Sequence, residues 1–356
     1  MKTYDQAQTY LGRAQYALAQ GVRSAWYQAH LIMARRRSSP LTRPGDPPYI
    51  SRTAPLDKKA LRRAFLDVFR QDRANIEEGL YPAPQDFRFE NIKQVLDLSQ
   101  AFLEDAKSVD QRRTARAGME IRHEKPDLVE KYPAYYRQNF HYQTDGWLSD
   151  ESARLYDTQV ETLFSGAADA MRRAALAEIA RVLRGRDQRA QHYLDLACGT
   201  GRFLSHVMTG FPKLQAAGLD LSPHYAKAAR KATQNWPHVN IAEGAGEDIP
   251  FCDHQFDLLS AIYLFHEIPP KLRSQIFREI ARVLKPEGIF IFADSLQYGD
   301  VPGLDAVLEV FPEGFHEPYY KTYLNADLGK EIEAAGFALV KTNYAFLTKI
   351  QVWRKH

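Results

Sequence analysis

The sequence predicts an α/β protein whose core is a doubly wound parallel sheet, preceded by an α-helical N-terminal region. Beyond residue 191, short apolar strand-like runs alternate with helix-like runs, and this alternation is typical of a parallel sheet covered by helices on both faces. A glycine-containing turn at residues 199–201 joins the first of these runs to a helix-like segment. Before residue 131, apolar residues instead recur at helical spacing, which indicates helices without strands.

Residues 1–130 are expected to form the α-helical N-terminal region. Apolar residues follow helical spacing over residues 4–37, 57–78 and 91–109, and we predict a helix over each stretch. Proline and glycine residues mark the loops between them, at residues 38–55 and 79–84. Each of these helices is therefore bounded by its own turn signals.

The N-terminal region is also the basic part of the chain. Residues 1–80 hold 14 Lys and Arg against 7 Asp and Glu, a net charge of +7, and the remainder has a net charge of −4. A solvated helix surface accounts for the arginine run 35–37, and contact with an anionic membrane surface or an acidic partner is the alternative. Nucleic acid is not expected as a partner, because the run lacks interleaved aromatic residues.

Residues 131–190 are expected to form an aromatic-rich cap segment followed by a linking helix. The stretch 132–147 combines aromatic residues with hydrogen-bonding side chains, among them His141. Aromatic rings with a polar tip suit either the boundary between two domains or the wall of a small-molecule pocket, and both interpretations stay open. A single long helix is predicted over residues 152–184, leading into the first strand.

The turn after the first predicted strand has the residues of a nucleotide-cofactor site. Gly199 and Gly201 allow the backbone to approach a ligand closely, and a helix that begins near Gly201 presents unpaired N–H groups. Asp220 ends the next predicted strand and can accept hydrogen bonds from a ribose diol. A dinucleotide fingerprint requires a third glycine where this chain has Leu204, so the pattern does not favour a nicotinamide cofactor.

Four further blocks follow the turn in order. Ser222-Pro223 starts a helix, and the next block reads Glu-Gly-Ala-Gly-Glu-Asp-Ile-Pro-Phe at 243–251. A strand and its exit loop follow at 256–269, and a turn with a further strand at 282–293. With the glycine turn, these blocks resemble the class I S-adenosylmethionine-dependent methyltransferases, and are most similar to the ubiquinone-biosynthesis-type, or type 11, family. The resemblance covers about residues 191–356.

This resemblance implies a Rossmann-like, mostly parallel seven-stranded sheet with an antiparallel last strand in residues 191–356. The extended pair 337–343 and 346–353 fits the end of such a sheet. The resemblance also implies S-adenosyl-L-methionine as the cofactor, with the glycine turn around its methionine part. The residues that it places at the cofactor are Asp195, Ala197, Cys198, Gly199, Thr200, Gly201, Asp220, Leu221, Gly246, Glu247, Asp248 and Tyr263.

Two positions depart from the family pattern. Ala197 stands where the family has the first glycine of the turn. Ala245 stands where relatives often have an acid that accepts the adenine amino hydrogen. We expect Glu247, Asp248 or backbone groups around Gly246 to contact adenine instead.

Methyl transfer from a sulfonium is an in-line displacement, so the protein must mainly hold and align the two reactants and exclude water. A base that deprotonates the acceptor should lie at the carboxyl end of the fourth strand. His266 is there by sequence order, with Tyr263 and Glu267 nearby, and its titration range suits this role. The alternative is that His266 binds a backbone carbonyl or lines the pocket, since many relatives need no side-chain base.

A second aromatic and ionisable segment, at about residues 297–323, follows the fifth strand and is expected to be an inserted lid. We predict that it meets the segment 132–147 over the methyl group, which adds His141 and His316 to the candidate catalytic residues. A surface turn before Pro318 is the alternative for His316.

Composition narrows the class of protein. The chain has 356 residues, of which 45% are hydrophobic, enough for two domains. The sequence has no apolar run of about eighteen residues and no secretory signal at its N-terminus, so a cytoplasmic location is expected. The two cysteines, at 198 and 252, are not at metal-ligand spacing, and the His-Glu pairs at 266–267 and 316–317 lack the i, i+4 spacing of a helical metal site. No metal is therefore predicted.

The sequence thus predicts an S-adenosylmethionine-dependent methyltransferase that acts on an apolar or aromatic small molecule, such as a phenol, a quinol or a lipid-like acceptor. The 12% of aromatic residues, concentrated in the two predicted lids, motivates this acceptor class. A nicotinamide-dependent oxidoreductase and a non-catalytic cofactor-binding interaction module are the alternatives. The long N-terminal helices carry enough apolar surface for a homodimer.

Overall fold

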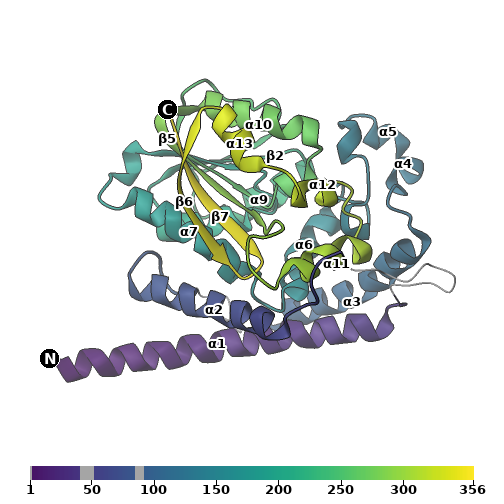
Figure 1. Ribbon diagram of the computed structural model, residues 1–356, viewed down its shortest axis with the longest axis horizontal. Coiled ribbons are helices and arrows are strands. Elements are labelled where there is room, and N and C mark those ends of the chain that lie inside the picture. The colour runs from purple at the N-terminus through teal and green to yellow at the C-terminus, as the bar shows by residue number, and fades with distance from the viewer. Residues whose placement is uncertain (1, 41–51, 85–91) are drawn as a thin grey trace.

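The computed structural model describes residues 2–40, 52–84 and 92–356. These residues form a seven-stranded sheet with helices on both faces, and a group of N-terminal helices crosses one end of it (Figure 1). The predicted loop 38–55 lies mostly outside the described residues, and so does residue 91, the predicted start of the third helix.

The sheet has the strand order β3-β2-β1-β4-β5-β7-β6. Strands β3, β2, β1, β4 and β5 pair in parallel, whereas β7 pairs antiparallel to both β5 and β6. The predicted doubly wound, mostly parallel sheet with an antiparallel last strand is therefore confirmed. The strands are β1 (His192–Leu196), β2 (Gln215–Asp220), β3 (Asn240–Glu243), β4 (Phe256–Ile262), β5 (Leu284–Ser295), β6 (Phe337–Ala345) and β7 (Thr348–Lys355).

Alternating side chains bury both faces of the sheet. In β5, Ile289 and Ile291 pack on the face covered by α7, α8 and α9, while Phe290 and Phe292 pack on the opposite face with α10 and α13. A strand with both faces buried explains the continuous apolar run in its sequence. The elements around the sheet are α7 (Ala168–Leu183), η4 (Gln188–Ala190), α8 (Arg202–Gly210), α9 (Pro223–Ala232), η5 (Phe265–Glu267), α10 (Pro270–Val283), α11 (Asp305–Gly314), α12 (Tyr320–Leu324) and α13 (Leu328–Ala334).

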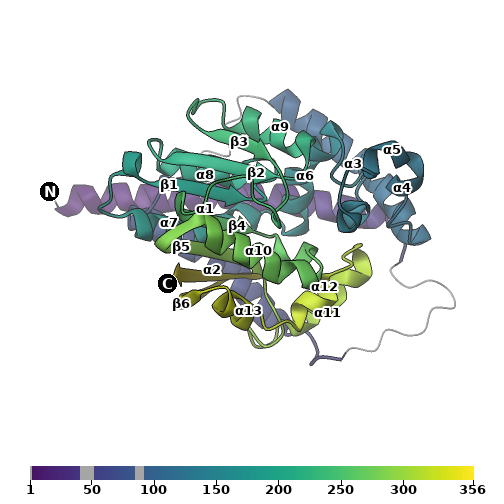
Figure 2. The same cartoon turned by 90° about the horizontal axis from the view of Figure 1, so that it is seen from above.

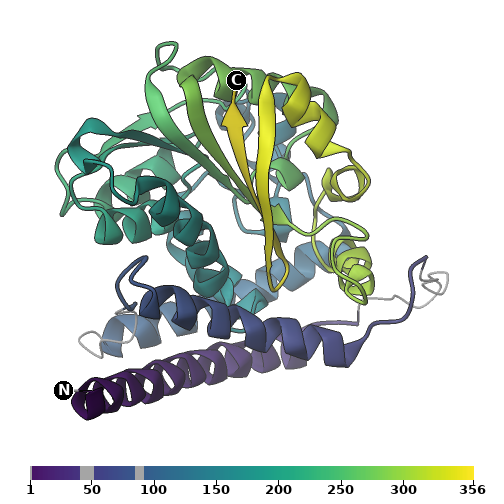
Figure 3. The same ribbon diagram turned by 60° about the vertical axis from the view of Figure 1, so that its left-hand side comes forward.

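The N-terminal helices α1 and α2 lie side by side beyond the end of the sheet where β6 turns into β7 (Figures 1 and 3). Phe65 of α2 packs edge-on against Phe346 of that turn, with 5.4 Å between the ring centroids. Since β6 runs parallel to β5, this turn marks the carboxyl edge of the sheet. The elements before the sheet are α1 (Lys2–Arg37), α2 (Lys58–Glu77), α3 (Ile92–Ala115), α4 (Ile121–Glu124), α5 (Pro126–Val129), η2 (Ala134–Tyr136), η3 (Phe140–Tyr142) and α6 (Asp150–Leu163).

The single helix predicted over residues 152–184 is wrong, because the chain forms two helices, α6 and α7, with a turn between them. Ser165 and Gly166 adopt positive φ angles of 53° and 83°, and the Gly166 N–H donates a hydrogen bond to the Glu161 carbonyl at 2.8 Å. This is the geometry of a glycine C-cap. A Cβ on Gly166 would lie 3.0 Å from Ser24 Cα, so α1 packs directly on the turn.

Helix α1 runs behind the sheet along the length of the molecule (Figure 2). It exposes apolar side chains, including Leu18 at 70% and Ile32 at 51%, and the arginine run 35–37 at its end is exposed too. Arg23, by contrast, is buried at 3%. The homodimer and the contact with an anionic surface stay predictions. Within the part of the chain that the structure describes, no helix combines the length and apolarity that crossing a membrane requires.

Candidate functional site

The glycine turn leaves the carboxyl end of β1 with three residues in left-handed conformations. Ala197, Gly199 and Gly201 have φ angles of 55°, 56° and 76°. A left-handed conformation costs a non-glycine residue about 1 kcal/mol. Ala197 therefore adopts the same backbone conformation as a glycine would, with a small strain. A Cβ on Gly199 would meet no atom within 4 Å, which leaves an open cradle at this position.

Asp220, at the carboxyl end of β2, faces the same turn. Its carboxylate accepts hydrogen bonds from the N–H groups of Gly199 and Ser222, both at 2.8 Å. Burial raises the pKa of Asp220 to about 6, although these two donors oppose the shift. The carboxylate is therefore ionised at neutral pH and fixed in orientation.

A pocket of about 820 Å³, open to solvent, lies over the turn at the carboxyl edge of the sheet. The sheet and its loops supply one wall, and aromatic rings from residues 135–156 supply much of the other. The lining residues are Tyr135, Tyr136, Trp147, Tyr156, Leu196, Ala197, Gly199, Leu219, Asp220, Leu221, Tyr225, Gly244, Gly246, Ile262, Tyr263, Leu264, Glu267, Ile268 and Ile276.

Some of the predicted cofactor residues line this pocket and others support it from behind. Asp195, only 1% exposed, accepts a hydrogen bond from Ser260 at 2.7 Å. Burial raises the pKa of Asp195 to about 7, against the hydrogen bonds of Ser260 and Tyr193. Thr200 donates to Asp157 of α6 at 2.9 Å. Those that line the pocket are Ala197, Gly199, Asp220, Leu221, Gly246 and Tyr263.

Gly201 and Cys198 shape the turn through packing and do not line the pocket. A Cβ on Gly201 would lie 2.9 Å from the Cα of Ala229 in α9, so the absence of a side chain lets α8 and α9 approach. The Cys198 thiol is buried against Gly218, where a Cβ would lie 2.8 Å from the sulfur. The sequence predicted that Gly201 allows the backbone to approach a ligand, but in the structure it allows close packing against helix α9.

The acids predicted near adenine differ in their relation to the pocket. Glu247 accepts a hydrogen bond at 3.0 Å from the hydroxyl of Tyr135, which lines the pocket with Gly246. Asp248 is not among the lining residues. Glu247 therefore reaches the pocket wall through an aromatic residue of the cap segment.

A second pocket, of about 660 Å³, adjoins the first. Tyr156 and Tyr263 line both pockets, so the two pockets share part of their walls. Tyr263 has a positive φ of 58°, and its hydroxyl shares a hydrogen bond with Thr348 at 2.8 Å. The remaining lining is largely apolar. The lining residues are His141, Tyr156, Val160, Leu163, Phe164, Tyr263, His266, Ser295, Val307, Leu308, Phe311, Glu317, Tyr320 and Leu347.

Ionisable side chains from four separate segments meet where the two pockets adjoin. His141 Nε2 lies 2.5 Å from Glu317 Oε1 and 3.0 Å from Glu267 Oε1. His266 Nε2 lies 3.5 Å from the same Glu267 oxygen, and its Nδ1 contacts Asp294 at 2.5 Å. We call His141, His266, Glu267, Asp294 and Glu317 the acid–imidazole cluster.

Burial and mutual charge shift the pKa values within the acid–imidazole cluster. Burial lowers the pKa of His141, but Glu317 and Glu267 outweigh it and raise it well above its usual value. For His266 the Asp294 carboxylate likewise outweighs burial, and the pKa rises to about 9. Burial, followed by Glu317, raises the pKa of Glu267 to about 7. His141 outweighs burial for Glu317 and lowers its pKa.

The two predicted lid segments do meet. The His141 N–H donates to the His316 carbonyl at 3.0 Å, and the rings of His141 and Phe315 lie edge to face with centroids 6.4 Å apart. The His316 side chain lines neither pocket, because its ring contacts Gln138 Oε1 at 2.9 Å. Glu317 lines the second pocket instead. Of the neighbouring residues His316 and Glu317, only the carboxylate therefore faces a pocket.

Sequence reasoning singled out neither Tyr156 nor Tyr225 as pocket residues, and it treated Glu317 only as a partner of His316. Tyr156 lies in α6, which the sequence predicted only as part of a linking helix. It lines both pockets because of the way α6 packs over the sheet. The high aromatic content of residues 132–147 was the sequence feature that indicated an aromatic pocket wall, and this stretch ends before Tyr156.

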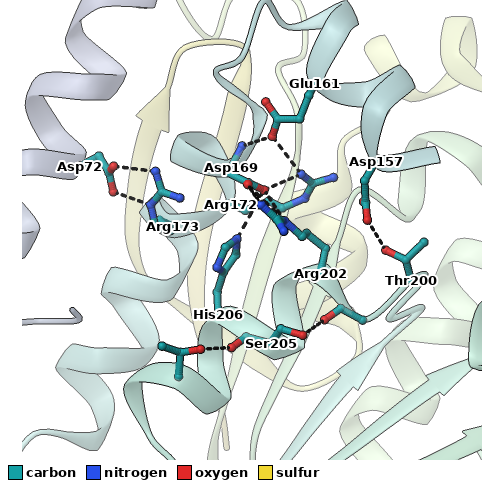
Figure 4. Close-up of polar contacts among 12 residues, drawn as sticks. Asp72, Asp157, Glu161, Asp169, Arg172, Arg173, Thr200, Arg202, Ser205 and His206 are labelled. Atoms are coloured by element: carbon teal, nitrogen blue, oxygen red, sulfur yellow. Dashed lines mark hydrogen bonds and ion pairs between the residues drawn. The ribbon is translucent and has the colours of Figure 1, made fainter. Parts of the chain in front are cut away.

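Buried charged residues tie the glycine turn to the helices before the sheet (Figure 4). Thr200 is bound to Asp157 of α6, and Arg202 at the start of α8 pairs with Asp169 of α7. Asp169 also contacts Arg23 of α1 at 2.9 Å. The turn is therefore fixed in position by segments that precede it by up to about 180 residues.

Known proteins resemble the chain in the region of this site. A family model described as a methyltransferase domain, of type 11, matches residues 194–292. An uncharacterized methyltransferase of Synechocystis sp. is 34% identical over 151 residues, which are 42% of this chain and 68% of that protein. The demethylmenaquinone methyltransferase of Chlorobaculum tepidum is 34% identical over 142 residues, 39% of this chain and 54% of that protein.

A fatty-acid O-methyltransferase of Mycolicibacterium smegmatis is 29% identical over 127 residues, 35% of this chain and 45% of that protein. The chain thus spans about half the length of these last two relatives. The match with the Synechocystis protein covers more than two thirds of that protein, and the matched family residues include the glycine turn and Asp220. The chain therefore belongs to the class I S-adenosylmethionine-dependent methyltransferases, with S-adenosylmethionine as its cofactor.

Proposed function

We propose that this chain transfers the methyl group of S-adenosylmethionine to an apolar or aromatic small molecule held in the second pocket. The observation that carries the proposal is that Tyr156 and Tyr263 line both pockets. A ligand in one pocket therefore lies next to a ligand in the other, as a direct displacement requires. The lining of the second pocket, with residues such as Leu163 and Phe311, favours an apolar ring or chain.

The first pocket fits the cofactor in its chemistry. The open cradle at Gly199 leaves room for a ligand against the backbone, and the Asp220 carboxylate can accept hydrogen bonds from a ribose diol. We assign the adenine end to the side of Gly246 and Tyr135. When bound, the cofactor supplies a methyl group on a positively charged sulfur.

The acid–imidazole cluster would act on the reacting group of the acceptor. His141, His266 and Glu317 line the second pocket, and Glu267 lines the first, so the cluster borders both. A polar, proton-bearing group of an otherwise apolar acceptor would be stabilised at this end of the pocket and not at the apolar end. We infer that the cluster stabilises the negative charge that develops on that group, in a site from which the lid segments exclude water.

Two relatives support this acceptor class by their names. One is named for a fatty acid and another for demethylmenaquinone. Their matches cover only 39% and 35% of this chain, respectively for the demethylmenaquinone and the fatty-acid enzyme. The similarity therefore supports the class of acceptor but not a particular molecule.

The proposal can be tested by filling the second pocket from α11. Val307 lines it, whereas Val310 on the same helix is 40% exposed and does not. Val307→Trp should retain S-adenosylmethionine binding, measured by calorimetry, and lose at least tenfold in methyl transfer from labelled cofactor to a panel of phenols, quinols and fatty acids. Val310→Trp, the matched control, should behave as the unmodified protein in both assays.

Equal rates of methyl transfer by the Val307→Trp and Val310→Trp variants would show that the acceptor does not bind in the second pocket. If no member of the panel accepts a methyl group from the unmodified protein while the cofactor still binds, the apolar acceptor class is wrong.

A further inference from the structure

We propose that His141, Glu267 and Glu317 bind a divalent transition-metal ion where the two pockets adjoin. One ligand atom from each residue lies within 4.8 Å of the other two. Atoms that share an ion at about 2.0–2.2 Å are themselves separated by roughly 3.0–3.5 Å. The contacts of His141 Nε2, at 2.5 Å and 3.0 Å from the two carboxylates, are close to that spacing, so an ion requires only small side-chain shifts.

The carboxylates of this site have unused acceptor capacity. Among the described residues, no group donates a hydrogen bond to Glu317 Oε2 or to Glu267 Oε2, and Glu317 Oε1 has His141 Nε2 as its partner at 2.5 Å. Both residues are more than nine-tenths buried, Glu317 at 5% and Glu267 at 6% exposure. Buried carboxylate oxygens without donors are costly, and a bound cation removes that cost.

The three candidate ligands are held by separate elements, which fixes them in place. His141 adopts a positive φ of 56° in η3, and its N–H is bound to the His316 carbonyl. Strained backbone of this kind persists where the surrounding structure holds it and is enriched at functional sites. Glu267 ends η5 after β4, and Glu317 precedes α12. Because the ligands lie up to 176 residues apart, their spacing in the sequence could not indicate a metal site.

The chemistry of the donors narrows the choice of ion. One imidazole nitrogen and two carboxylates suit Mn²⁺, Fe²⁺ or Zn²⁺ better than Mg²⁺ or Ca²⁺, which prefer oxygen alone. His266 stands beside the site, 3.5 Å from Glu267, with its Nδ1 held by Asp294. Such an outer carboxylate–imidazole pair orients the ligands of many metal sites.

Three protein ligands leave further coordination positions open, as in catalytic metal sites. His141 and Glu317 line the second pocket, so the open side faces the acceptor. There the ion would bind the acceptor oxygen, lower its pKa and stabilise it after its proton leaves to a nearby base or water. The oxygen then forms its bond to the methyl carbon as the carbon–sulfur bond breaks. This role rests on the proposed function, whereas binding of the ion does not.

The test is metal binding by the full-length protein after removal of bound metal with a chelator. Electron paramagnetic resonance and calorimetry with Mn²⁺ should show one site per chain. Glu317→Gln should weaken it at least tenfold, whereas Glu313→Gln, an exposed acid on the neighbouring α11, should leave it unchanged. Cofactor binding by the same samples reports whether each variant is folded.

Anomalous diffraction from crystals grown with Mn²⁺ gives a second readout that needs no variant, and should place the ion between His141 Nε2 and the two carboxylates. The proposal is overturned if the unmodified protein binds none of Mn²⁺, Fe²⁺ and Zn²⁺ at millimolar concentration, or if Glu317→Gln binds Mn²⁺ as tightly as Glu313→Gln. Either result would leave the methyltransferase proposal intact, because cofactor binding and methyl transfer are measured without added metal.

Discussion

Two opposing effects act on the pKa of Asp220. Two backbone N–H groups bind its carboxylate and lower the pKa, but burial outweighs them and the pKa is raised. The place of Asp220 was predictable from the sequence, because an acid at the end of the second strand depends on local order along the chain. Glu317 was harder to place, because its direction depends on how the segment 297–323 folds back over the sheet. Cys198 and Thr200 belong to the predicted motif, and only the three-dimensional packing shows that their side chains lie behind the pocket.

The binding of S-adenosylmethionine should depend on pH through Asp220. In the free protein its pKa is about 6, and the ionised form is the better acceptor for a ribose diol. Affinity should therefore be constant above pH 7 and fall as the pH drops below 6, by up to about tenfold per pH unit. Asp220→Asn should bind more weakly at pH 7.5, on the order of 2 kcal/mol, and show a flat profile in calorimetry.

The control for the pH experiment is Asp195→Asn. Asp195 titrates near pH 7 but lies behind the pocket, so this variant should keep the dependence below pH 6. A flat profile for Asp195→Asn, together with an unchanged profile for Asp220→Asn, would transfer the effect to Asp195.

At the scale of elements, most helices and strands follow from patterns in the sequence, whereas the breaks between them depend on packing. The alternation beyond residue 191 predicted the five parallel strands, and the extended pair 337–343 and 346–353 predicted β6 and β7. The break between α6 and α7 was missed because Ser165-Gly166 interrupts an otherwise helical pattern by only a few residues. Its C-cap geometry is reinforced by α1, which lies against Gly166 and is distant in the sequence.

The contact between α8 and α9 gives a prediction about the glycine turn. Gly201→Ala places a methyl group 2.9 Å from the Ala229 Cα, in addition to its positive φ of 76°. Gly185→Ala is a matched control, because Gly185 has a φ of 78° and no atom within 4 Å of its Cβ position. In urea unfolding both should lose about 1 kcal/mol from the backbone conformation, and Gly201→Ala about 1–3 kcal/mol more. Equal losses would mean that α9 yields to the added methyl group.

At the scale of the whole molecule, the N-terminal helices are joined to the sheet by buried charge as well as by apolar contacts. Arg173 of α7 makes two contacts with Asp72 of α2, at 2.8 Å and 2.9 Å, and both residues are nearly inaccessible. The Tyr16 and Tyr81 hydroxyls donate to the same carboxylate, at 2.5 Å and 2.8 Å. The pair of Asp72 and Arg173 thus crosses the expected boundary at residue 130.

Breaking this buried pair should destabilise the whole chain. Arg173→Met leaves the Asp72 carboxylate buried without its guanidinium, which typically costs about 3–5 kcal/mol. Arg70→Met removes an exposed contact with Asp67 on α2 and should cost less than about 1 kcal/mol. Chemical denaturation followed by circular dichroism measures both. A loss for Arg173→Met no larger than for Arg70→Met would show that apolar packing alone holds α2.

The two pockets are lined by residues from inside and outside the stretch that matches the family, and this division affects how the substrate range of related proteins can change. The glycine turn, Asp220 and Gly246 of the first pocket lie within the stretch 194–292 that matches the family, whereas Tyr156, Val160 and Leu163 of the second pocket come from α6, outside that stretch. Under the proposed function, exchange of α6 would alter the substrate range while the glycine turn and Asp220 are inherited unchanged. A shortened protein expressed from residues 194–292 alone would, for the same reason, lack the side of both pockets that Tyr156 and α6 supply.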